Sequence, residues 1–157
     1  KDTPSVLALS RQNLTAQRVE NSEKNLCARG AYELAPASAN AKVSLLATGS
    51  EVEIAMAAQK ILEKDGIPAR VVSMPCLDLF DRQSQDFQRD MLGEGTVKIA
   101  IEAAARFGWD RYIGADGDFI GMTGFGASAP APDLYKHFNI TPEAAVAAAK
   151  ARLAEKS

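Results

Sequence analysis

The stretch VSLLATGSEVEIAMAAQKILEKDGIPARVVSM, residues 43–74, decides the fold of this chain. It begins with VSLLA at 43–47, a mainly apolar run of strand length, which is typical of a strand covered on both faces. It ends with a second such run, ARVVSM at 69–74. The residues between them have the apolar spacing of a helix that is long enough to connect two parallel strands. The stretch therefore predicts a strand–helix–strand unit.

The helix in this unit carries its own start and stop signals. Ser50 followed three residues later by Glu53 matches a capping box, so we expect Ser50 to be the N-cap. Asp65 and Gly66 mark the end of the helix. Charged residues such as Glu51 interrupt the apolar stripe, which indicates a helix with one side in solvent.

The same alternation continues after this unit. Residues 78–80 are predicted as a loop, and Asp81 or Ser84 can cap a helix that runs to about Leu92. A third strand, VKIAI, follows at 97–101. Strands and helices in this order predict an α/β fold with a mostly parallel sheet.

The last third of the chain combines turns with one clear helix. Glycines and aromatic residues are frequent in residues 107–126, with a short strand near 118–122. A helix can open at 130–133. Thr141 as N-cap and Pro142 at the first helical position, followed by an alanine-rich run, predict a final helix.

The beginning of the chain has a different character. Residues 4–10 suit a short strand, residues 31–34 are compatible with another, and residues 35–42 have the composition of a loop or linker. We therefore expect a boundary between Asn13 and Lys42, with the compact domain after it.

Composition and charge restrict the class of protein. The chain has 157 residues, of which 46% are hydrophobic, enough for the core of one ordinary domain. Its formal net charge of −2, with acids and bases interspersed, argues against partners such as nucleic acid or an anionic membrane. No apolar run reaches the length of a bilayer span and no signal peptide is recognisable, so we expect a cytoplasmic protein. Anionic small molecules stay open as ligands, because one arginine can bind a phosphate whatever the net charge.

Thiol and histidine chemistry is sparse. Cys27 and Cys76 lie far apart in the sequence, which favours free thiols, and Cys76 is expected to be buried or half-buried. His137 is the only histidine, so a metal cluster built from several histidines is excluded within this chain. Its position near a helix end favours a structural role. The glycines of residues 124–132 either let the backbone approach a ligand or only form a tight loop.

Three positions near predicted strand ends could carry chemistry. The turn at Thr48–Glu51 could hold a phosphate at a helix N-terminus, but it has one glycine and nearby glutamates, so an ordinary capped helix is preferred. Glu102 follows a predicted strand, where α/β proteins place functional side chains; the alternatives are that it caps, pairs with a basic group or accepts backbone N–H bonds. Arg11, flanked by Ser10 and Gln12, carries a guanidinium suited to phosphate or carboxylate, or is a solvated surface residue.

Four segments, in this order and spacing, closely resemble the C-terminal end of transketolases. Together they are far more specific than any one of them alone. They are LALSRQNL (7–14), LLATGSEVEIAMAAQKIL (45–62), ARVVSMPCLDLFDRQ (69–83) and FGASAPAPDLYKHFNIT (125–141). The resemblance covers essentially the whole chain but only the last part of a complete family member.

The resemblance implies a fold and a division of the chain. The implied fold is a three-layer α/β/α arrangement around a five-stranded, mostly parallel sheet with one antiparallel strand. Residues 1–14 would be the remnant of a pyrimidine-binding domain, residues 15–42 a connector, and residues 43–157 the transketolase C-terminal domain. We therefore expect the chain to be a fragment of a longer enzyme.

The resemblance also implies a chemistry. Transketolases move a two-carbon ketol unit from a ketose phosphate to an aldose phosphate, use thiamine diphosphate with a divalent metal (Mg or Ca), and work as homodimers. The family segments that hold the cofactor and the metal have no counterpart here, so no catalytic, cofactor-binding or metal-binding residue is predicted. Arg11 matches the arginine of the family's SRQ motif, which grips the substrate phosphate, and is the predicted substrate-binding residue.

Three interpretations of the chain's own role stay open. The first is an inactive fragment that serves structure and dimer assembly in the parent enzyme. The second is a regulatory domain that binds a ligand at the carboxyl ends of its strands. The third is an origin in a related thiamine-diphosphate enzyme, deoxyxylulose-phosphate synthase or the β chain of a 2-oxoacid dehydrogenase, whose sequences match these segments less well.

Overall fold

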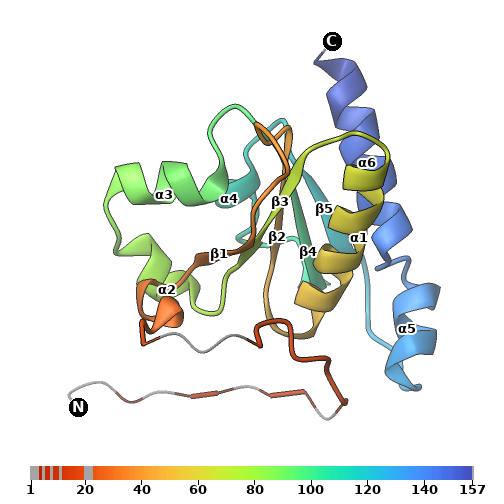
Figure 1. Ribbon diagram of the computed structural model, residues 1–157. Coiled ribbons are helices and arrows are strands. Elements are labelled where there is room, and N and C mark those ends of the chain that lie inside the picture. Colours follow the sequence, from red (N-terminus) through yellow and green to blue (C-terminus); the bar gives the residue numbers. More distant parts are fainter. Residues whose placement is uncertain (1–3, 5, 8, 11, 20–22, 157) are drawn as a thin grey trace.

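A mixed sheet of five strands, in the order β1-β3-β2-β4-β5, forms the centre of the molecule (Figure 1). The computed structural model describes residues 4, 6, 7, 9, 10, 12–19 and 23–156. β1 runs antiparallel to β3, and the other neighbouring strands pair in parallel. The strands are β1 (Tyr32–Ala35), β2 (Val43–Ala47), β3 (Ala69–Ser73), β4 (Val97–Ala105) and β5 (Asp118–Met122).

Helices cover both faces of this sheet. α1 (Val52–Lys64) and α6 (Pro142–Glu155) pack against one face. α2 (Leu77–Asp81), α3 (Gln85–Leu92) and α4 (Asp110–Ile113) contribute to the core on the other face. α5 (Ala131–His137) follows β5 and precedes α6 along the chain. The described residues also form two short 3-10 helices, η1 (Leu26–Arg29) and η2 (Gly49–Glu51). The three-layer α/β/α fold with one antiparallel strand is confirmed.

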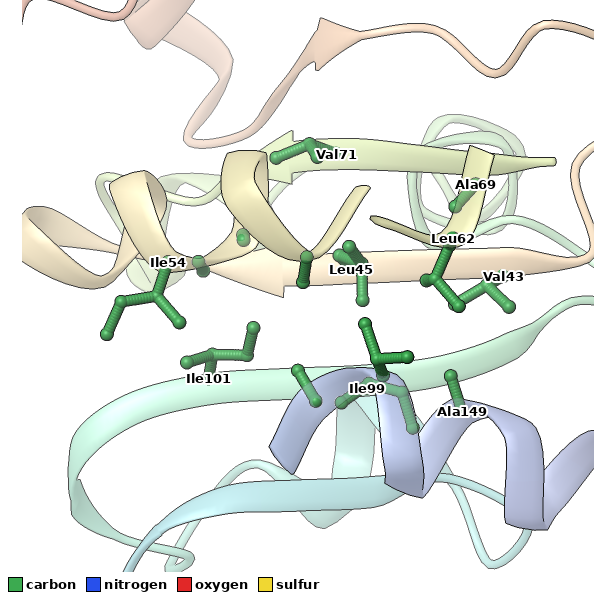
Figure 2. Packing of buried hydrophobic residues seen from close by; sticks show 14 of the residues in the cluster. Val43, Leu45, Ile54, Leu62, Ala69, Val71, Ile99, Ile101 and Ala149 are labelled. Atoms are coloured by element: carbon green, nitrogen blue, oxygen red, sulfur yellow. The ribbon is translucent and has the colours of Figure 1, made fainter. Parts of the chain in front are cut away.

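The core under α1 and α6 explains why the opening stretch folds as it does. Every residue of β2 is buried. Because successive strand residues point to opposite faces, Leu45 packs towards α1 and Leu46 towards the other layer, and both are 0% exposed. Figure 2 shows Leu45 among side chains from three strands and both helices, including Ile54 of α1 and Ala149 of α6. Burial of one such leucine contributes about 1.5–3 kcal/mol, so the strand is fixed from both sides.

The core on the opposite face is aromatic. The ring of Tyr112 lies 5.9 Å from those of Phe80 and Trp109, measured between centroids. Its hydroxyl donates a hydrogen bond of 2.9 Å to Asp81 at the end of α2, and Arg111 pairs with the same carboxylate at 2.9 Å. Burial, followed by the bond to Asp81, raises the pKa of Tyr112 to about 12. The short helices α2 and α4 are thereby joined through the carboxylate of Asp81, which binds both Tyr112 and Arg111.

The helix starts agree with the sequence in two cases and differ in one. Thr141 accepts a bond of 3.2 Å from the Ala144 amide, and Ser84 caps α3, so both predicted N-caps are confirmed. The predicted N-cap at Ser50 is wrong, because Ser50 lies within η2 and α1 begins at Val52. Its hydroxyl donates to the neighbouring carboxylate of Glu51, and neither η2 nor α1 has a side-chain capping bond.

Two element boundaries also differ from the prediction. The predicted loop at 78–80 is helical and belongs to α2. β4 continues past Ile101 to Ala105, so Glu102 lies inside the strand and does not follow it. The extension exists because Ala105 still pairs with Met122 of β5, a partner that lies far away in the sequence.

The N-terminal segment lies outside the sheet. The described residues within 4–10 form no strand, contrary to the prediction, and Val6, Leu7 and Leu9 are 95%, 77% and 81% exposed. A strand needs a neighbour for its backbone hydrogen bonds, and no described strand lies beside this segment. The short strand considered at 31–34 does form, as β1. The division at residues 14 and 42 stays a prediction, although β1 already belongs to the sheet.

Candidate functional site at the carboxyl edge of the sheet

The connections of the sheet create a crevice between the ends of β2 and β4. The chain leaves β2 for β3 on one side, and then passes over β2 to form β4 on the other side. In open α/β sheets, ligands bind outside the carboxyl ends of the strands where the order reverses in this way. Here that edge is the lower one in Figure 1, and the described N-terminal residues run along it. The fold therefore places the start of the chain at the preferred binding position.

Two cavities open at this edge and share three residues. A groove of about 830 Å³ lies between the N-terminal segment and the turn after β2, and Glu102 and Pro75 complete its wall. A second cavity of about 300 Å³ lies beside it, lined mainly by apolar side chains of β5, α5 and the loop between them. Both cavities are lined by Gln12, Ser50 and Glu51. These three residues form the boundary between the two spaces.

A hydrogen-bonded cluster of four side chains stands at this boundary, and we call it the Glu51 cluster. Glu51 is only 6% exposed and accepts bonds from the hydroxyl groups of Ser50 and Tyr135. The Tyr135 hydroxyl lies 3.0 Å from that of Ser50 and accepts a bond of 3.2 Å from the Gln12 amide. Gln12, Ser50, Glu51 and Tyr135 thus join the N-terminal segment, η2 and α5.

The direction of the protons in the Glu51 cluster follows from donor counts. A phenol has one proton, and the bond to a carboxylate is the stronger use of it. Gln12 therefore donates to Tyr135, and Tyr135 donates to Glu51. Burial, and then the bond to Glu51, raise the pKa of Tyr135. The phenol keeps its proton at neutral pH, and the direction of the chain of bonds is fixed.

A second contact fixes the N-terminal segment a few residues further on. The Thr15 hydroxyl donates a bond of 2.9 Å to the carboxylate of Glu53 at the start of α1. Glu53 thus serves this segment and does not complete a capping box with Ser50. Together with the Gln12 contact, this bond ties residues 12–15 to the domain at two points.

The other predicted candidates have structural partners. Glu102 accepts a bond from the indole nitrogen of Trp109, a neutral side-chain donor that the sequence did not suggest. His137 is the last residue of α5 and packs edge-on against Phe138, with 4.7 Å between ring centroids. Cys76 is half-buried and Cys27 exposed, and both are free thiols in the part of the chain that the structure describes.

Arg11, the predicted substrate-binding residue, lies outside the described residues. Its neighbours Ser10 and Gln12 both line the groove. The turn at Thr48–Glu51 places a buried carboxylate at the start of the helix, which argues against a phosphate there; of the preferred capped helix, the helix is confirmed and the side-chain cap is wrong. Glu51 itself is a correction: the sequence predicted a solvated charge, and it is a buried hydrogen-bond acceptor.

Tyr135 and its role went unnoticed in the sequence. It stands in LYKHFN among residues that read as an ordinary helix end. Its partners lie 84 and 123 residues away along the chain, so no local pattern signals the contact. Glu51 and Glu53 were a weak signal of the contact, because two acidic residues at a helix start need hydrogen-bond donors nearby.

Metal and membrane tests give simple results. Across the described ranges, no three His, Cys, Asp or Glu side chains come together in a group that could hold a metal ion. In the same part of the chain, no helix is both long and apolar enough to cross a membrane.

Comparison with known proteins identifies the family. The family model of the transketolase-like TK C-terminal domain matches residues 30–141. The chain belongs to this family. Its sequence is 56% identical over 150 residues to the transketolase of Sinorhizobium medicae, and 43% identical over 152 residues to transketolase 1 of Escherichia coli. These matches cover 95% and 96% of this chain, but 21% and 23% of the relatives.

Solved structures agree with this assignment. A mutant transketolase of Pichia stipitis superposes with a TM-score of 0.80 at 37% identity, covering 92% of this chain and 20% of that one. The transketolase of Leishmania mexicana gives a TM-score of 0.73 at 39% identity, covering 80% of this chain and 18% of that one. The transketolase C-terminal fold is thereby confirmed, and the chain spans about a fifth of the length of these relatives.

Proposed function

We propose that this chain acts as the C-terminal domain of a transketolase, an enzyme that moves a two-carbon ketol unit between sugar phosphates. The observation that carries the proposal is the 56% identity to a transketolase over 95% of this chain. The full-length enzyme that contains this chain would be cytoplasmic and homodimeric. The chain would contribute structure and dimer assembly; the structural part is supported by its packed sheet, with buried clusters on both faces.

The cofactor chemistry belongs to the rest of such an enzyme. The divalent metal that accompanies thiamine diphosphate needs oxygen ligands such as carboxylates, and the described residues bring no group of three His, Cys, Asp or Glu side chains together. The carboxylates near the carboxyl edge are already engaged by Ser50, Tyr135 and Trp109. This chain alone therefore does not fit the cofactor, and we expect it to be inactive in isolation.

Arg11 is the residue through which this chain would touch substrate. Its guanidinium can bind a phosphate through two parallel hydrogen bonds. Its neighbours Ser10 and Gln12 line the groove at the switch of the sheet, the usual place for a ligand. A related Pichia stipitis transketolase, 37% identical to this chain, has been solved with xylulose 5-phosphate. We propose that Arg11 grips the phosphate of such a sugar.

Two assays test this function. The isolated chain with thiamine diphosphate and Mg²⁺ should not transfer the ketol unit, and turnover would overturn the division of labour. In the full-length enzyme that contains this chain, Arg11→Gln should raise KM for xylulose 5-phosphate but leave KM for unphosphorylated xylulose unchanged. Equal effects on both sugars would remove Arg11 from the phosphate site.

A regulatory role has one observation in its favour. The cavity of about 300 Å³ is lined mainly by apolar groups, with Glu51 and Gln12 at one end. Such a lining suits a small ligand with an apolar body and a hydrogen-bond donor. Calorimetric titration with nucleotides and sugar phosphates tests this role, and the absence of heat with all of them would eliminate it for these ligand classes.

A further inference from the structure

One oxygen of the Glu51 carboxylate has no partner in the described structure. The hydroxyl groups of Ser50 and Tyr135 both donate to the same oxygen, Oε1. Oε2 accepts no hydrogen bond from any residue that the structure describes, and it is not among the described atoms that are both unbonded and sealed from solvent. Oε2 therefore reaches the space that Glu51 lines, which is the cavity of about 300 Å³ and the groove beside it.

The negative charge of Glu51 also lacks a basic partner. Its side chain is only 6% exposed, and no lysine, arginine or histidine within the described ranges forms an ion pair with it. A carboxylate removed from water is costly unless it is hydrogen-bonded and paired with a positive charge. The two hydroxyl groups at Oε1 supply the hydrogen bonds. The positive charge is the part that is missing, and Oε2 is where a ligand would supply it.

The lining of the cavity indicates what such a cation would carry. Away from the Glu51 cluster, the cavity is bounded mainly by apolar groups, among them Met122, Leu134, Phe138 and Ile140. These residues come from β5, α5 and the segment after α5, so the walls belong to the folded domain. A volume of about 300 Å³ is at the small end of the range for ligand pockets. The cavity therefore suits a small molecule with an apolar body and one charged end.

We propose that this cavity binds a small primary ammonium ion with an apolar body, whose ammonium group donates to Oε2 of Glu51. The inference rests on the regulatory role considered above and does not involve Arg11. It changes the ligand class of that role, because the phosphate of a nucleotide or sugar phosphate would face a buried carboxylate of the same sign. An ammonium also fits better than a guanidinium, which favours both oxygens of a carboxylate, because Oε1 already accepts two bonds.

Two probes of similar shape test the site in this chain. Benzylamine and benzyl alcohol share the same ring and differ in the group that would meet Glu51. Nuclear magnetic resonance of the methyl groups of Met122, Leu134 and Ile140, which line the cavity, reports binding. We expect saturable shifts with both probes and an affinity about tenfold higher for benzylamine, because a charged hydrogen bond is stronger than a neutral one. Equal affinities, or no shift with either probe, would overturn the proposal.

Two variants in the cavity locate the binding. Glu51→Gln keeps the size of the side chain and removes its charge, so it should lower the affinity for benzylamine about tenfold and leave that for benzyl alcohol unchanged. Ala131→Leu adds an apolar group at the first residue of α5, in the cavity wall, and should weaken both probes. This second variant keeps the test valid if Glu51→Gln does not fold. Unchanged binding in Ala131→Leu would place the probes elsewhere and overturn the proposal.

A matched control is available on the other face of the sheet. Asp81 also accepts a bond from a tyrosine hydroxyl, that of Tyr112 at 2.9 Å, but it already pairs with Arg111 at 2.9 Å. Asp81→Asn therefore removes a carboxylate of the same kind without touching the cavity. It should leave the affinity for both probes unchanged. Loss of the preference for benzylamine in this control would show that any such carboxylate is sufficient, and would overturn the proposal.

The last measurement uses the full-length enzyme that contains this chain. Calorimetric titration with benzylamine should give heat that Glu51→Gln removes. If Glu51→Gln changes nothing there, the rest of the enzyme already fills the cavity and the proposal is overturned. If benzylamine binds through Glu51 but leaves the transfer of the ketol unit unchanged, the regulatory role fails and the ammonium site is still supported.

Discussion

Replacement of Gly30 by alanine should destabilise this domain far more than the addition of one methyl group suggests. Gly30 ends η1 with φ 83°, a left-handed conformation that alanine adopts only with strain. A Cβ atom there would lie 2.2 Å from the Phe80 amide nitrogen and 2.3 Å from the Cys76 carbonyl oxygen. Both atoms belong to backbone, so no side-chain rotation can relieve the overlap.

The magnitude has two parts. The left-handed conformation costs about 1–2 kcal/mol for a residue with a Cβ. Relief of the overlap requires α2 to shift, which would pull the fully buried Phe80 out of its place in the aromatic core. Overpacking of this kind costs about 1–3 kcal/mol more. We therefore expect Gly30→Ala to lower the free energy of unfolding by about 2–5 kcal/mol.

Gly66 provides the matched control. It has a similar φ of 74°, but no described atom would lie within 4 Å of an added Cβ. Gly66→Ala should therefore show the conformational part alone. Urea unfolding followed by the fluorescence of Trp109, the single tryptophan in the sequence and 2% exposed, measures both variants. Equal losses of unfolding free energy in Gly30→Ala and Gly66→Ala would refute the argument, because α2 would then move aside at no energetic cost.

Three further predictions concern titration and capping. The pKa of Tyr112 is raised to about 12, so its neutral form should stabilise the fold fully below the ordinary tyrosine pKa of 10.0. This stabilisation should disappear as the pH rises through about 12. The absorbance of tyrosinate should show one late titration, and Tyr112→Phe should abolish it. The Ser38 hydroxyl lowers the pKa of Glu63, so Glu63 should add to the free energy of unfolding above the ordinary carboxyl pKa. This contribution should be lost as the pH falls through the lowered pKa. Glu63→Gln should flatten that part of the plot of urea-unfolding free energy against pH, and an unchanged plot would contradict the prediction. Thr141→Ala should cost about 1 kcal/mol of unfolding free energy, because the Thr141 side chain caps α6. Thr48→Ala should cost less, because the Thr48 side chain makes no capping bond to any described residue. Thermal unfolding that ranks the two variants in the opposite order would count against the cap assignment.

The regular elements could be predicted because their signals are local. VSLLA and ARVVSM are long apolar runs, and Thr141 followed by Pro142 begins a helix through its own backbone chemistry. α2 was missed because five residues carry too little periodicity, and its place depends on Phe80 finding the aromatic core. The extension of β4 was missed because its alanines have no strand preference and are held by β5.

The site was less accessible from the sequence than the fold. The family resemblance pointed to Arg11, but the contacts that hold its neighbour come from Tyr135 and Glu51, which are far apart along the chain. The charge of Glu51 predicted exposure, because acidic residues are rarely buried unless they are paired. Only the folded chain brings the two hydroxyl donors to that carboxylate, so the sequence alone gave the wrong environment.

The antiparallel strand β1 also protects the molecule from self-association. It covers the outer edge of β3, with Tyr32 opposite Ser73 and Glu33 opposite Val72. Without it, the buried and largely apolar β3 would present unpaired amide and carbonyl groups to any extended chain, a template for aggregation. β1 is synthesised before β3, so the strand that covers this edge is already available when β3 emerges from the ribosome. Four residues that look like part of a connector thus keep the edge of β3 from pairing with another chain.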